Sequence, residues 1–274
     1  MCETCGCVVA GSQSGHAAHD PHHHHDHHHA HHQETGAAIT VMRGLMAGND
    51  HQAAHNRAHF AEHRVLAVNL MSSPGAGKTA LLEATIAAIG DRMRIAVIEG
   101  DLETENDAER IRARGVPAVQ ITTGTACHLD AFMVHDALHG LDLDGLDIVF
   151  IENVGNLVCP AAFDLGQHAN VALLSVTEGD DKPAKYPVMF RGADLVLLSK
   201  ADLLAHFDDF DPAKAERYVR ALANRAPVER VSVRTEGGLA PWIDWLRASL
   251  AEVQAHGAAP AAHPHADAVA GAGR

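Results

Sequence analysis

Short apolar runs alternate with longer mixed segments from residue 65 to residue 233 of the chain. The runs are rich in Val, Ile and Leu and lack polar alternation, which is typical of strands buried on both faces of a sheet. We therefore predict seven strands, at residues 65–71, 94–99, 118–122, 147–152, 171–177, 194–199 and 228–233.

The mixed segments between these runs predict helices, among them residues 79–89, 105–114 and 212–224. Asp211 precedes Pro212, and a capping side chain followed by a proline in the first turn is a typical helix start. Strands that alternate with helices indicate a parallel arrangement with helices on both faces. The predicted fold is therefore a three-layer α/β domain around a mostly parallel sheet of about seven strands.

The segments that flank this alternation differ from it. Residues 1–36 are of low complexity and predict a flexible Cys/His-rich tail, while the Ala/Gly/Pro-rich residues 257–274 predict a second disordered tail. Residues 37–64 predict a helix. We therefore expect one domain over residues 37–256, between two tails.

Within the predicted helix, histidine recurs at every fourth position, which places the four side chains on one face. These residues are His51, His55, His59 and His63. The stripe is either a solvated polar face or a group of imidazoles that binds a soft or borderline metal.

Composition narrows the function classes. The 274 residues include 47% hydrophobic residues, 23 histidines and a formal net charge of −14. A broadly acidic chain repels phosphate, so we expect neither nucleic acid nor a membrane as a partner. Eleven histidines lie between His16 and His32. The start lacks a secretory signal, no run is long enough to span a membrane, and we expect a cytoplasmic protein.

The segment from Ser72 to Thr79, SSPGAGKT, follows a predicted strand and opens a predicted helix. This is the context of a P-loop, in which glycines let backbone N–H groups surround phosphate oxygens. Lys78 would reach the β and γ phosphates, and the Thr79 hydroxyl would ligate Mg²⁺. Ser72 stands where the pattern usually has glycine.

A P-loop needs a carboxylate near the magnesium ion, and such groups emerge at strand ends in this fold class. Glu152 ends one predicted strand, with Gly155 three residues later, as in the DxxG element of GTPases but with Glu for Asp. Asp101 ends the strand after the P-loop helix and would hold magnesium or orient the attacking water; a helix N-cap or a turn residue is the alternative. We expect Lys78, Asp101 and Glu152 to be catalytic.

The choice of base is indicated by Ser199-Lys200-Ala201-Asp202, which resembles the NKxD element of GTPases with Ser for Asn. The Asp202 carboxylate would accept hydrogen bonds from guanine N1 and N2, which adenine does not offer, and the Lys200 stem would stack on the base. We expect GTP rather than ATP. The predicted nucleotide-binding residues are Gly75, Ala76, Gly77, Lys78, Thr79, Ala80, Gly155, Lys200, Asp202, Ser232 and Val233.

All five cysteines would be thiols or metal ligands in a reducing compartment. Cys2, Cys5 and Cys7 lie close enough to surround one ion, and thiolate ligands suit Ni²⁺, Zn²⁺ or Cu⁺. Cys127 precedes His128, and Cys159 lies on the segment expected to move on hydrolysis. Taken singly, these two cysteines are equally consistent with buried structural thiols.

The chain resembles the HypB family of GTPases, which deliver nickel during maturation of nickel-iron hydrogenase. The matching segments are the CxxCGC start, the His-rich insertion, Asn49-Asp50 with Asn56-Arg57, residues 69–79, Gly100-Asp101, Thr123-Gly124, residues 127–130 and residues 152–160. They span nearly the whole chain.

This resemblance implies a SIMIBI-class P-loop domain that hydrolyses GTP slowly to GDP and phosphate. It implies a homodimer linked to nucleotide and metal, a HypA-type nickel/zinc chaperone as partner, and the hydrogenase large-subunit precursor as recipient. It also implies a high-affinity nickel site at Cys2, Cys5 and Cys7, and a weaker nickel or zinc site at Cys127, His128 and Cys159.

Two other functions remain alternatives. A urease-maturation GTPase also delivers nickel, but that family carries a Cys-Pro-His motif, which differs from the adjacent Cys127 and His128. A nickel store would use the His-rich tail as its working part, and this role is compatible with delivery by the GTPase domain.

Overall fold

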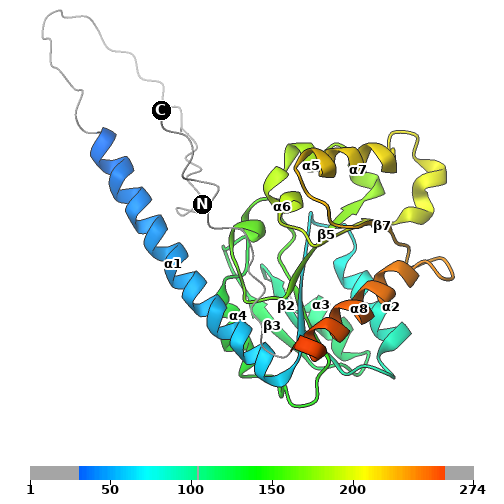
Figure 1. Ribbon diagram of the computed structural model, residues 1–274, viewed down its shortest axis with the longest axis horizontal. Helices are drawn as coiled ribbons and strands as arrows, with labels where there is room; N and C mark the ends of the chain where they lie inside the picture. Colours follow the sequence, from blue (N-terminus) through cyan, green and yellow to red (C-terminus); the bar gives the residue numbers. More distant parts are fainter. Residues whose placement is uncertain (1–30, 104, 257–274) are drawn as a thin grey trace, which may run out of the picture. The chain divides into compact units, whose positions relative to one another are not determined.

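The computed structural model describes residues 31–103 and 105–256 (Figure 1). Its contacts divide the chain into two units, residues 1–48 and 49–274. The second unit contains every strand. The expected metal ligands Cys2, Cys5 and Cys7 and most of the histidine-rich stretch lie outside the described residues.

The centre of the second unit is a seven-stranded sheet in which every neighbouring pair of strands is parallel. The strand order is β3-β2-β4-β1-β5-β6-β7. The strands are β1 (Leu66–Ser72), β2 (Ile95–Asp101), β3 (Ala118–Thr122), β4 (Ile148–Glu152), β5 (Ala169–Ser175), β6 (Leu195–Ser199) and β7 (Val228–Arg230). The predicted fold class and strand number are confirmed. Since the strands are parallel, their carboxyl ends meet at one edge of the sheet.

The helices described in the structure connect these strands. They are α1 (His31–His63), α2 (Lys78–Ile89), α3 (Asn106–Arg112), α4 (Ala131–Leu138), α5 (Lys182–Lys185), α6 (Pro187–Arg191), α7 (Pro212–Ala221) and α8 (Ala240–His256), with short 3₁₀ turns η2 (Cys159–Ala162), η3 (Val176–Glu178) and η4 (Ala201–His206). The expected cap of α7 is present, because the Asp211 side chain accepts a hydrogen bond from the Ala213 N–H.

Alternate residues of each strand enter different apolar clusters, which explains why the strands are apolar on both faces. Leu66, Val68 and Leu70 of β1 pack with α2, α3 and α8, where Trp242 is completely buried. Ala67 of β1 packs in a second cluster with α1 and α4. A third cluster joins β5 and β6 to α6 and α7. The arrangement is the expected three layers.

Several element ends differ from the sequence prediction. The described part of α1 starts at His31, so residues 31–36, which were expected to belong to the flexible tail, are helical. Strand β5 ends at Ser175, whose side chain accepts a hydrogen bond from the Thr177 N–H and starts a 3₁₀ turn. Helix α7 ends three residues early, before Ala223 takes a left-handed conformation with φ 61°. Local side-chain and backbone geometry decides the ends of β5 and α7.

Strand β7 is shorter than predicted, since it ends at Arg230 and not at residue 233. Beyond it the Ser232 N–H donates to the Gly238 carbonyl, which closes a loop instead of extending the sheet. Within residues 31–103 and 105–256, none of the helices combines the length and apolar character that crossing a bilayer requires.

Candidate functional site

The loop between β1 and α2 has the backbone of a phosphate-binding loop. Gly75 and Gly77 take positive φ angles of 75° and 100°, which residues with a Cβ rarely adopt. Gly77 is the residue before α2, so the free N–H groups of the helix start face the loop. Lys78 is buried, and its Nζ donates to the Ser72 Oγ at 3.1 Å. The serine that replaces the usual glycine thus holds the loop lysine.

Acidic side chains converge beside the loop. The Thr79 hydroxyl donates to Glu152 Oε1 at 2.8 Å. Glu99 of β2 is the register partner of Glu152 on β4, so the two carboxylates are neighbours across the strands. One oxygen each of Glu99, Asp107 and Glu152 lie within 4.8 Å of one another. Two strands of the sheet and the start of α3 therefore bring three carboxylates together, one of which is bonded to Thr79.

The buried carboxylates have raised pKa values. Burial raises the pKa of Glu152 to about 7, against the opposing effect of the Lys78 ammonium. Burial, followed by the Glu152 carboxylate, raises the pKa of Glu99 to about 8. Neither Glu99 Oε2 nor Glu152 Oε2 has a hydrogen-bond partner in the described part of the chain. Such a set of oxygens fits a hard divalent cation, which would compensate the buried charge.

Asp101 lies at the carboxyl end of β2, where the sequence placed it. Its Oδ1 accepts a hydrogen bond from the Leu102 N–H at 2.7 Å, and its carbonyl accepts one from the Thr123 N–H at 2.9 Å. The three-carboxylate cluster contains Glu99 and Asp107 in addition to the expected Glu152, and it does not contain Asp101. In this conformation Asp101 organises the turn after β2.

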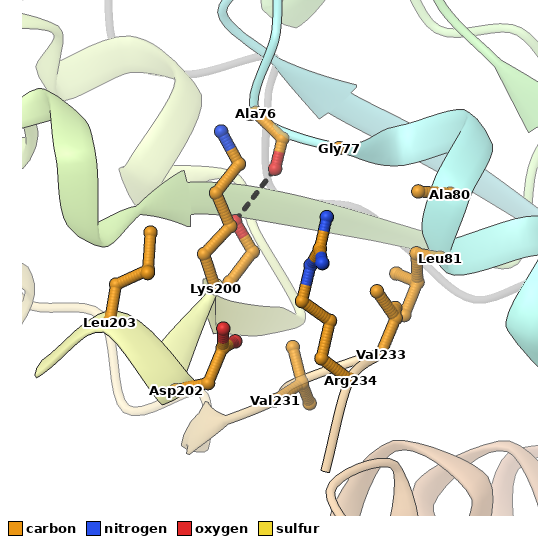
Figure 2. Close-up of a pocket in the computed structure, with 11 residues that line it drawn as sticks. Ala76, Gly77, Ala80, Leu81, Lys200, Asp202, Leu203, Val231, Val233 and Arg234 are labelled. Carbon is orange, nitrogen blue, oxygen red and sulfur yellow. Dashed lines mark hydrogen bonds between the residues drawn. The ribbon is translucent and has the colours of Figure 1, made fainter.

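A pocket of about 480 Å³ adjoins the other side of the loop (Figure 2). The residues around it come from the phosphate loop and α2, from the end of β6 and η4, and from the loop after β7. They are Ala76, Gly77, Ala80, Leu81, Ser199, Lys200, Asp202, Leu203, Val231, Val233 and Arg234. Its floor is largely apolar and Asp202 offers a carboxylate, which suits a flat heteroaromatic ring with donor groups on one edge.

The polar residues of this pocket are held by hydrogen bonds to the loop and to each other. The Ser199 hydroxyl donates to the Ala76 carbonyl at 2.7 Å, and Lys200 Nζ donates to the Gly75 carbonyl at 2.8 Å. Ser232 Oγ donates to Asp202 Oδ1 at 2.6 Å. Lys200 has a left-handed φ of 56°. This conformation is uncommon for residues other than glycine, and where it occurs it is concentrated at functional sites.

Gly155 brings the segment after β4 against the phosphate loop. A Cβ built on Gly155 would lie 2.9 Å from the Pro74 Cα and 3.0 Å from the Pro74 nitrogen. These are backbone atoms, so any larger residue would push the two segments apart. The glycine in the predicted DxxG-like element is therefore required by a close backbone approach.

Cys127, His128 and Cys159 are brought together although 31 residues separate His128 from Cys159. A ligand atom of each lies within 4.8 Å of the other two, and Cys127 Sγ is 3.9 Å from His128 Nδ1. The His128 ring stacks on Phe163 with centroids 3.9 Å apart. Burial lowers the pKa of His128, which favours the neutral imidazole that binds metals. Sulfur and imidazole together suit Ni²⁺ or Zn²⁺.

Comparison with known proteins places these features in a family. Residues 66–230 match the model of the CobW/HypB/UreG nucleotide-binding domain. The hydrogenase maturation factor HypB of Azotobacter vinelandii is 54% identical over 209 residues, which cover 76% of this chain and 68% of that protein. The chain belongs to the HypB family.

Solved structures of the HypB family agree with the fold. HypB from Helicobacter pylori in complex with nickel is 40% identical in sequence, and its superposition has a TM-score of 0.73. The matched region covers 78% of this chain and 99% of that chain. HypB from Archaeoglobus fulgidus is also 40% identical in sequence, and its superposition has a TM-score of 0.69. This match covers 74% of this chain and 99% of that chain. The chain is therefore a P-loop protein of the hydrogenase maturation type.

In this HypB family member, the buried Asn153 connects the segment after β4 to the metal-site loop. Its Oδ1 accepts a hydrogen bond from the Leu129 N–H at 3.2 Å, and its Nδ2 donates to Asn69 Oδ1 at 3.2 Å. Leu129 follows His128 directly, and Gly155 lies two residues after Asn153. One amide side chain thus contacts both the β1 strand and the backbone next to a predicted metal ligand.

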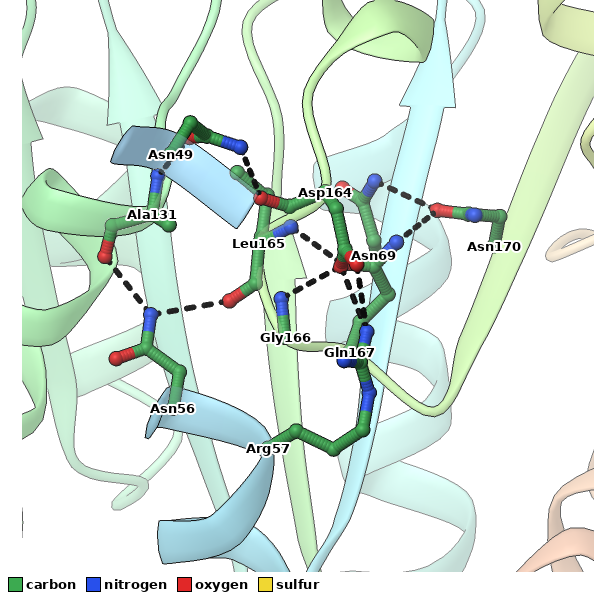
Figure 3. Close-up of polar contacts among 10 residues, drawn as sticks. All are labelled: Asn49, Asn56, Arg57, Asn69, Ala131, Asp164, Leu165, Gly166, Gln167 and Asn170. Carbon is green, nitrogen blue, oxygen red and sulfur yellow. Dashed lines mark hydrogen bonds and ion pairs between the residues drawn. The ribbon is translucent and has the colours of Figure 1, made fainter. Parts of the chain in front are cut away.

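Further amides extend this network to α1 (Figure 3). The Asn69 Nδ2 donates to Asn170 Oδ1, which also accepts from Gln167 Nε2. On α1, Asn56 Nδ2 donates to the carbonyls of Ala131 and Leu165. Asn56, which belongs to one of the segments that match the HypB family, thus fastens α1 to the start of α4.

Glu99 and Asp107 are the site residues that sequence reasoning missed. Glu99 is a charged residue at the end of a predicted buried strand, and that placement was the available signal. Asp107 lies among several acids in the 105–114 segment and carries no motif. Only the parallel register of β2 and β4 places Glu99 beside Glu152.

Proposed function

We propose that the protein is a GTP-hydrolysing nickel metallochaperone that delivers Ni²⁺ to the large-subunit precursor of nickel-iron hydrogenase. The proposal rests above all on the Cys127, His128 and Cys159 cluster, because Cys159 lies on the same segment as Glu152 and Gly155. A segment that contacts the phosphate loop at one end and contributes a metal ligand at the other is suited to coupling hydrolysis with metal release.

The nucleotide is GTP in this proposal. Asp202 is oriented by Ser232 Oγ at the edge of the pocket, and its carboxylate can accept hydrogen bonds from the N1 and N2 groups of guanine. Adenine has an acceptor instead of a donor at N1, so the Asp202 carboxylate would lack a hydrogen-bond donor there. Ser199, which replaces the usual Asn, bonds the Ala76 carbonyl and so joins the base pocket to the phosphate loop.

Hydrolysis uses residues at the carboxyl edge of the sheet. Lys78 binds the terminal phosphates, and Thr79 with Glu152 would hold Mg²⁺, which neutralises developing negative charge on the phosphates. We add Glu99 and Asp107 to the candidate magnesium group, since their oxygens lie close to those of Glu152. Asp101 is retained as a candidate for orienting the attacking water.

Nickel is the cargo. Cys127, His128 and Cys159 supply three ligands, so a tetrahedral ion would need a fourth from water or a second copy of the chain. We therefore propose a homodimer that responds to nucleotide and metal, with Zn²⁺ as a competing ion at the same ligands. Cys2, Cys5 and Cys7 are proposed as a second, tighter nickel site, and a HypA-type chaperone as the partner in transfer.

Exchange of Asp202 for Asn tests the assignment of guanine. The amide introduced at this position would no longer accept two hydrogen bonds from guanine but could donate to the O2 of xanthine. We expect Asp202→Asn to lower the affinity for GTP by about 10- to 100-fold and to raise that for XTP. Nucleotide affinities are measured by fluorescence titration with labelled, non-hydrolysable analogues of GTP and XTP.

The control for this exchange is Asp208→Asn, an exposed aspartate in the loop between η4 and α7. It should leave both nucleotide affinities unchanged. A retained preference of Asp202→Asn for GTP would show that another group reads the base.

A further inference from the structure

Five histidines gather where the second half of α1 lies against α4, and none of them belongs to the nucleotide pocket or to the Cys127 cluster. On α1 they are His55, His59 and His63; on α4 and directly after it they are His135 and His139. The spacing of four residues places the members of each set one turn apart on one helix face. The two faces meet, because the rings of His55 and His135 contact each other.

The distances between the rings are those of imidazoles that can share an ion. Ring centroids are 5.1 Å apart for His55 and His59, 4.9 Å for His55 and His135, and 6.2 Å for His59 and His135. The His139 ring is 4.8 Å from that of His135. Two imidazoles on one tetrahedral ion, each with a metal–nitrogen distance of ~2.0 Å, have centroids ~5 Å apart. The His55 spacings match this value, whereas the His59 and His135 rings are farther apart, and the nitrogens of the three rings do not all lie within 4.8 Å of one another. Side-chain rotations are therefore needed to bring three rings onto one ion.

His135 is the ring that joins the two helices, and its state suits metal binding. Its Nδ1 is buried and has no hydrogen-bond partner among residues 43–103 and 105–255. Burial, followed by the nearby His139, His55 and His59, lowers the pKa of His135, which disfavours the protonated ring. A buried imidazole nitrogen without a partner is unfavourable unless a ligand satisfies it.

The two helices are held in place by contacts beside the histidines. Asn56, next to His55, donates to the Ala131 carbonyl at 2.8 Å, and Asn49 Oδ1 accepts from the Ala131 N–H at 2.9 Å. Ala131 is the first residue of α4. A site between elements fixed in this way needs little reorganisation to bind an ion.

We propose that His55, His59 and His135 bind one divalent transition-metal ion of the borderline class, Ni²⁺ or Zn²⁺, with His139 within reach of the fourth position. Imidazole nitrogens prefer such ions over Mg²⁺ and Ca²⁺, which select oxygen ligands. His63 lies at the margin, where its Nδ1 is 2.9 Å from Asp144 Oδ1. This pairing fixes the ring at the edge of the cluster.

One of the two helices that hold the site, α4, begins at Ala131, three residues after His128. An ion held between α1 and α4 would brace the helix that follows the Cys127 and His128 loop, and would keep a second metal close to the cargo ligands. The binding itself does not depend on the proposed GTPase function, so the two can fail separately.

The test counts bound ions in the full-length protein. Equilibrium dialysis against Ni²⁺ or Zn²⁺, with metal analysis of the retained protein, compares the unmodified chain with the double variant His55→Ala/His135→Ala. We expect the double variant to bind one ion fewer than the unmodified chain. Excess Mg²⁺ should not displace this ion from the unmodified chain. The matched control is His51→Ala/His206→Ala, which removes two exposed histidines outside the cluster and should bind the unmodified number. Equal binding by the cluster variant and the unmodified protein would overturn the proposal.

A second measurement covers the case in which the double variant does not fold. Crystals of the unmodified protein soaked in NiCl₂ should give an anomalous difference peak between α1 and α4, within ~2.1 Å of nitrogens from at least two of the histidine rings. A map with nickel peaks elsewhere and none between these helices would refute the site.

Discussion

The ammonium of Lys78 is buried at the start of α2 and is influenced by four carboxylates, of which Glu152 and Glu99 have the largest effect. Desolvation lowers the pKa of Lys78, and the charges of Glu152 and Glu99 oppose this effect. A positive charge fixed in a site with little water interacts strongly with phosphate oxygens. We therefore attribute much of the proposed stabilisation of the terminal phosphates to this one residue.

Lys78→Ala should reduce GTP hydrolysis by about 100-fold or more, which is the typical loss when one preorganised charge or donor is removed. Phosphate release assays measure this effect. The matched control is Lys185→Ala, which removes the exposed lysine at the end of α5 that pairs with Asp181. Hydrolysis at the unmodified rate in Lys78→Ala would show that the loop lysine is not part of the machinery.

Glu99 and Glu152 make the stability of the metal-free protein depend on pH. Their folded pKa values, about 8 and about 7, lie above the ordinary value of 4.5, so the folded chain binds protons more tightly than the unfolded chain. The free energy of unfolding should therefore fall as pH rises from about 4.5 to about 8. Each kcal/mol lost should lower the melting temperature by about 2–4 °C.

Glu99→Gln should flatten this decline, because the variant has no proton to lose at that position. Melting temperatures are measured between pH 5 and pH 8.5 in EDTA. The control Glu62→Gln alters an exposed glutamate on α1 and should keep the unmodified slope. The same slope in Glu99→Gln would contradict the raised pKa of this group.

At the residue scale, the sequence predicted the phosphate loop because its motif has fixed spacing and follows a strand. It missed Glu99 because the proximity of that residue to Glu152 depends on which strands are neighbours. Strands β2 and β4 are adjacent in the sheet but are separated along the chain by β3. No local pattern encodes that adjacency.

At the scale of elements, α1 is fastened to the domain by polar contacts as well as by apolar packing. Phe60 of α1 is completely buried against β1 and α4. Arg57 Nη2 donates to both carboxylate oxygens of Asp164, at 2.9 and 2.7 Å, and Asn56 donates to two buried carbonyls. Figure 3 shows these contacts between α1 and the loop around residue 165.

Asn56→Ala should destabilise the fold by about 1–3 kcal/mol, because it leaves the carbonyls of Ala131 and Leu165 without their donor. Chemical denaturation measures the change. Gln52→Ala, one turn earlier, removes a longer and partly exposed bond at 3.3 Å and should cost less than about 0.5 kcal/mol. Equal effects of the two variants would mean that α1 is held by its apolar face alone.

The elements themselves were predictable, and several of their ends were not. The apolar runs located all seven strands, since a strand buried on both faces leaves a clear signal. The ends of β5 and β7 depend on Ser175 and on the loop closed by Ser232 and Gly238, which are local hydrogen bonds that hydrophobicity does not report. The meeting of α1 with α4, which forms the histidine cluster, is a tertiary contact outside the reach of periodicity.

At the scale of the whole molecule, the segment after β4 connects the phosphate loop with the proposed metal site. Gly155 approaches the backbone of Pro74 in the phosphate loop, Asn153 holds the backbone of Leu129, and Cys159 is a proposed metal ligand. A rearrangement of this segment on hydrolysis would change the position of Cys159 relative to Cys127 and His128. By linkage, metal would alter nucleotide affinity by the same factor.

The most direct test of this link is a nickel titration in the presence of GDP and of a non-hydrolysable GTP analogue. The variant Cys2→Ser/Cys5→Ser/Cys7→Ser leaves Cys127 and Cys159 as the thiolates that can produce a nickel charge-transfer band. The mass of the complex, measured in the same titration, reports dimerisation. We predict nickel affinities that differ by at least about 5-fold between the two nucleotide states, within the usual range of coupling energies. Identical affinities in both states would contradict the account.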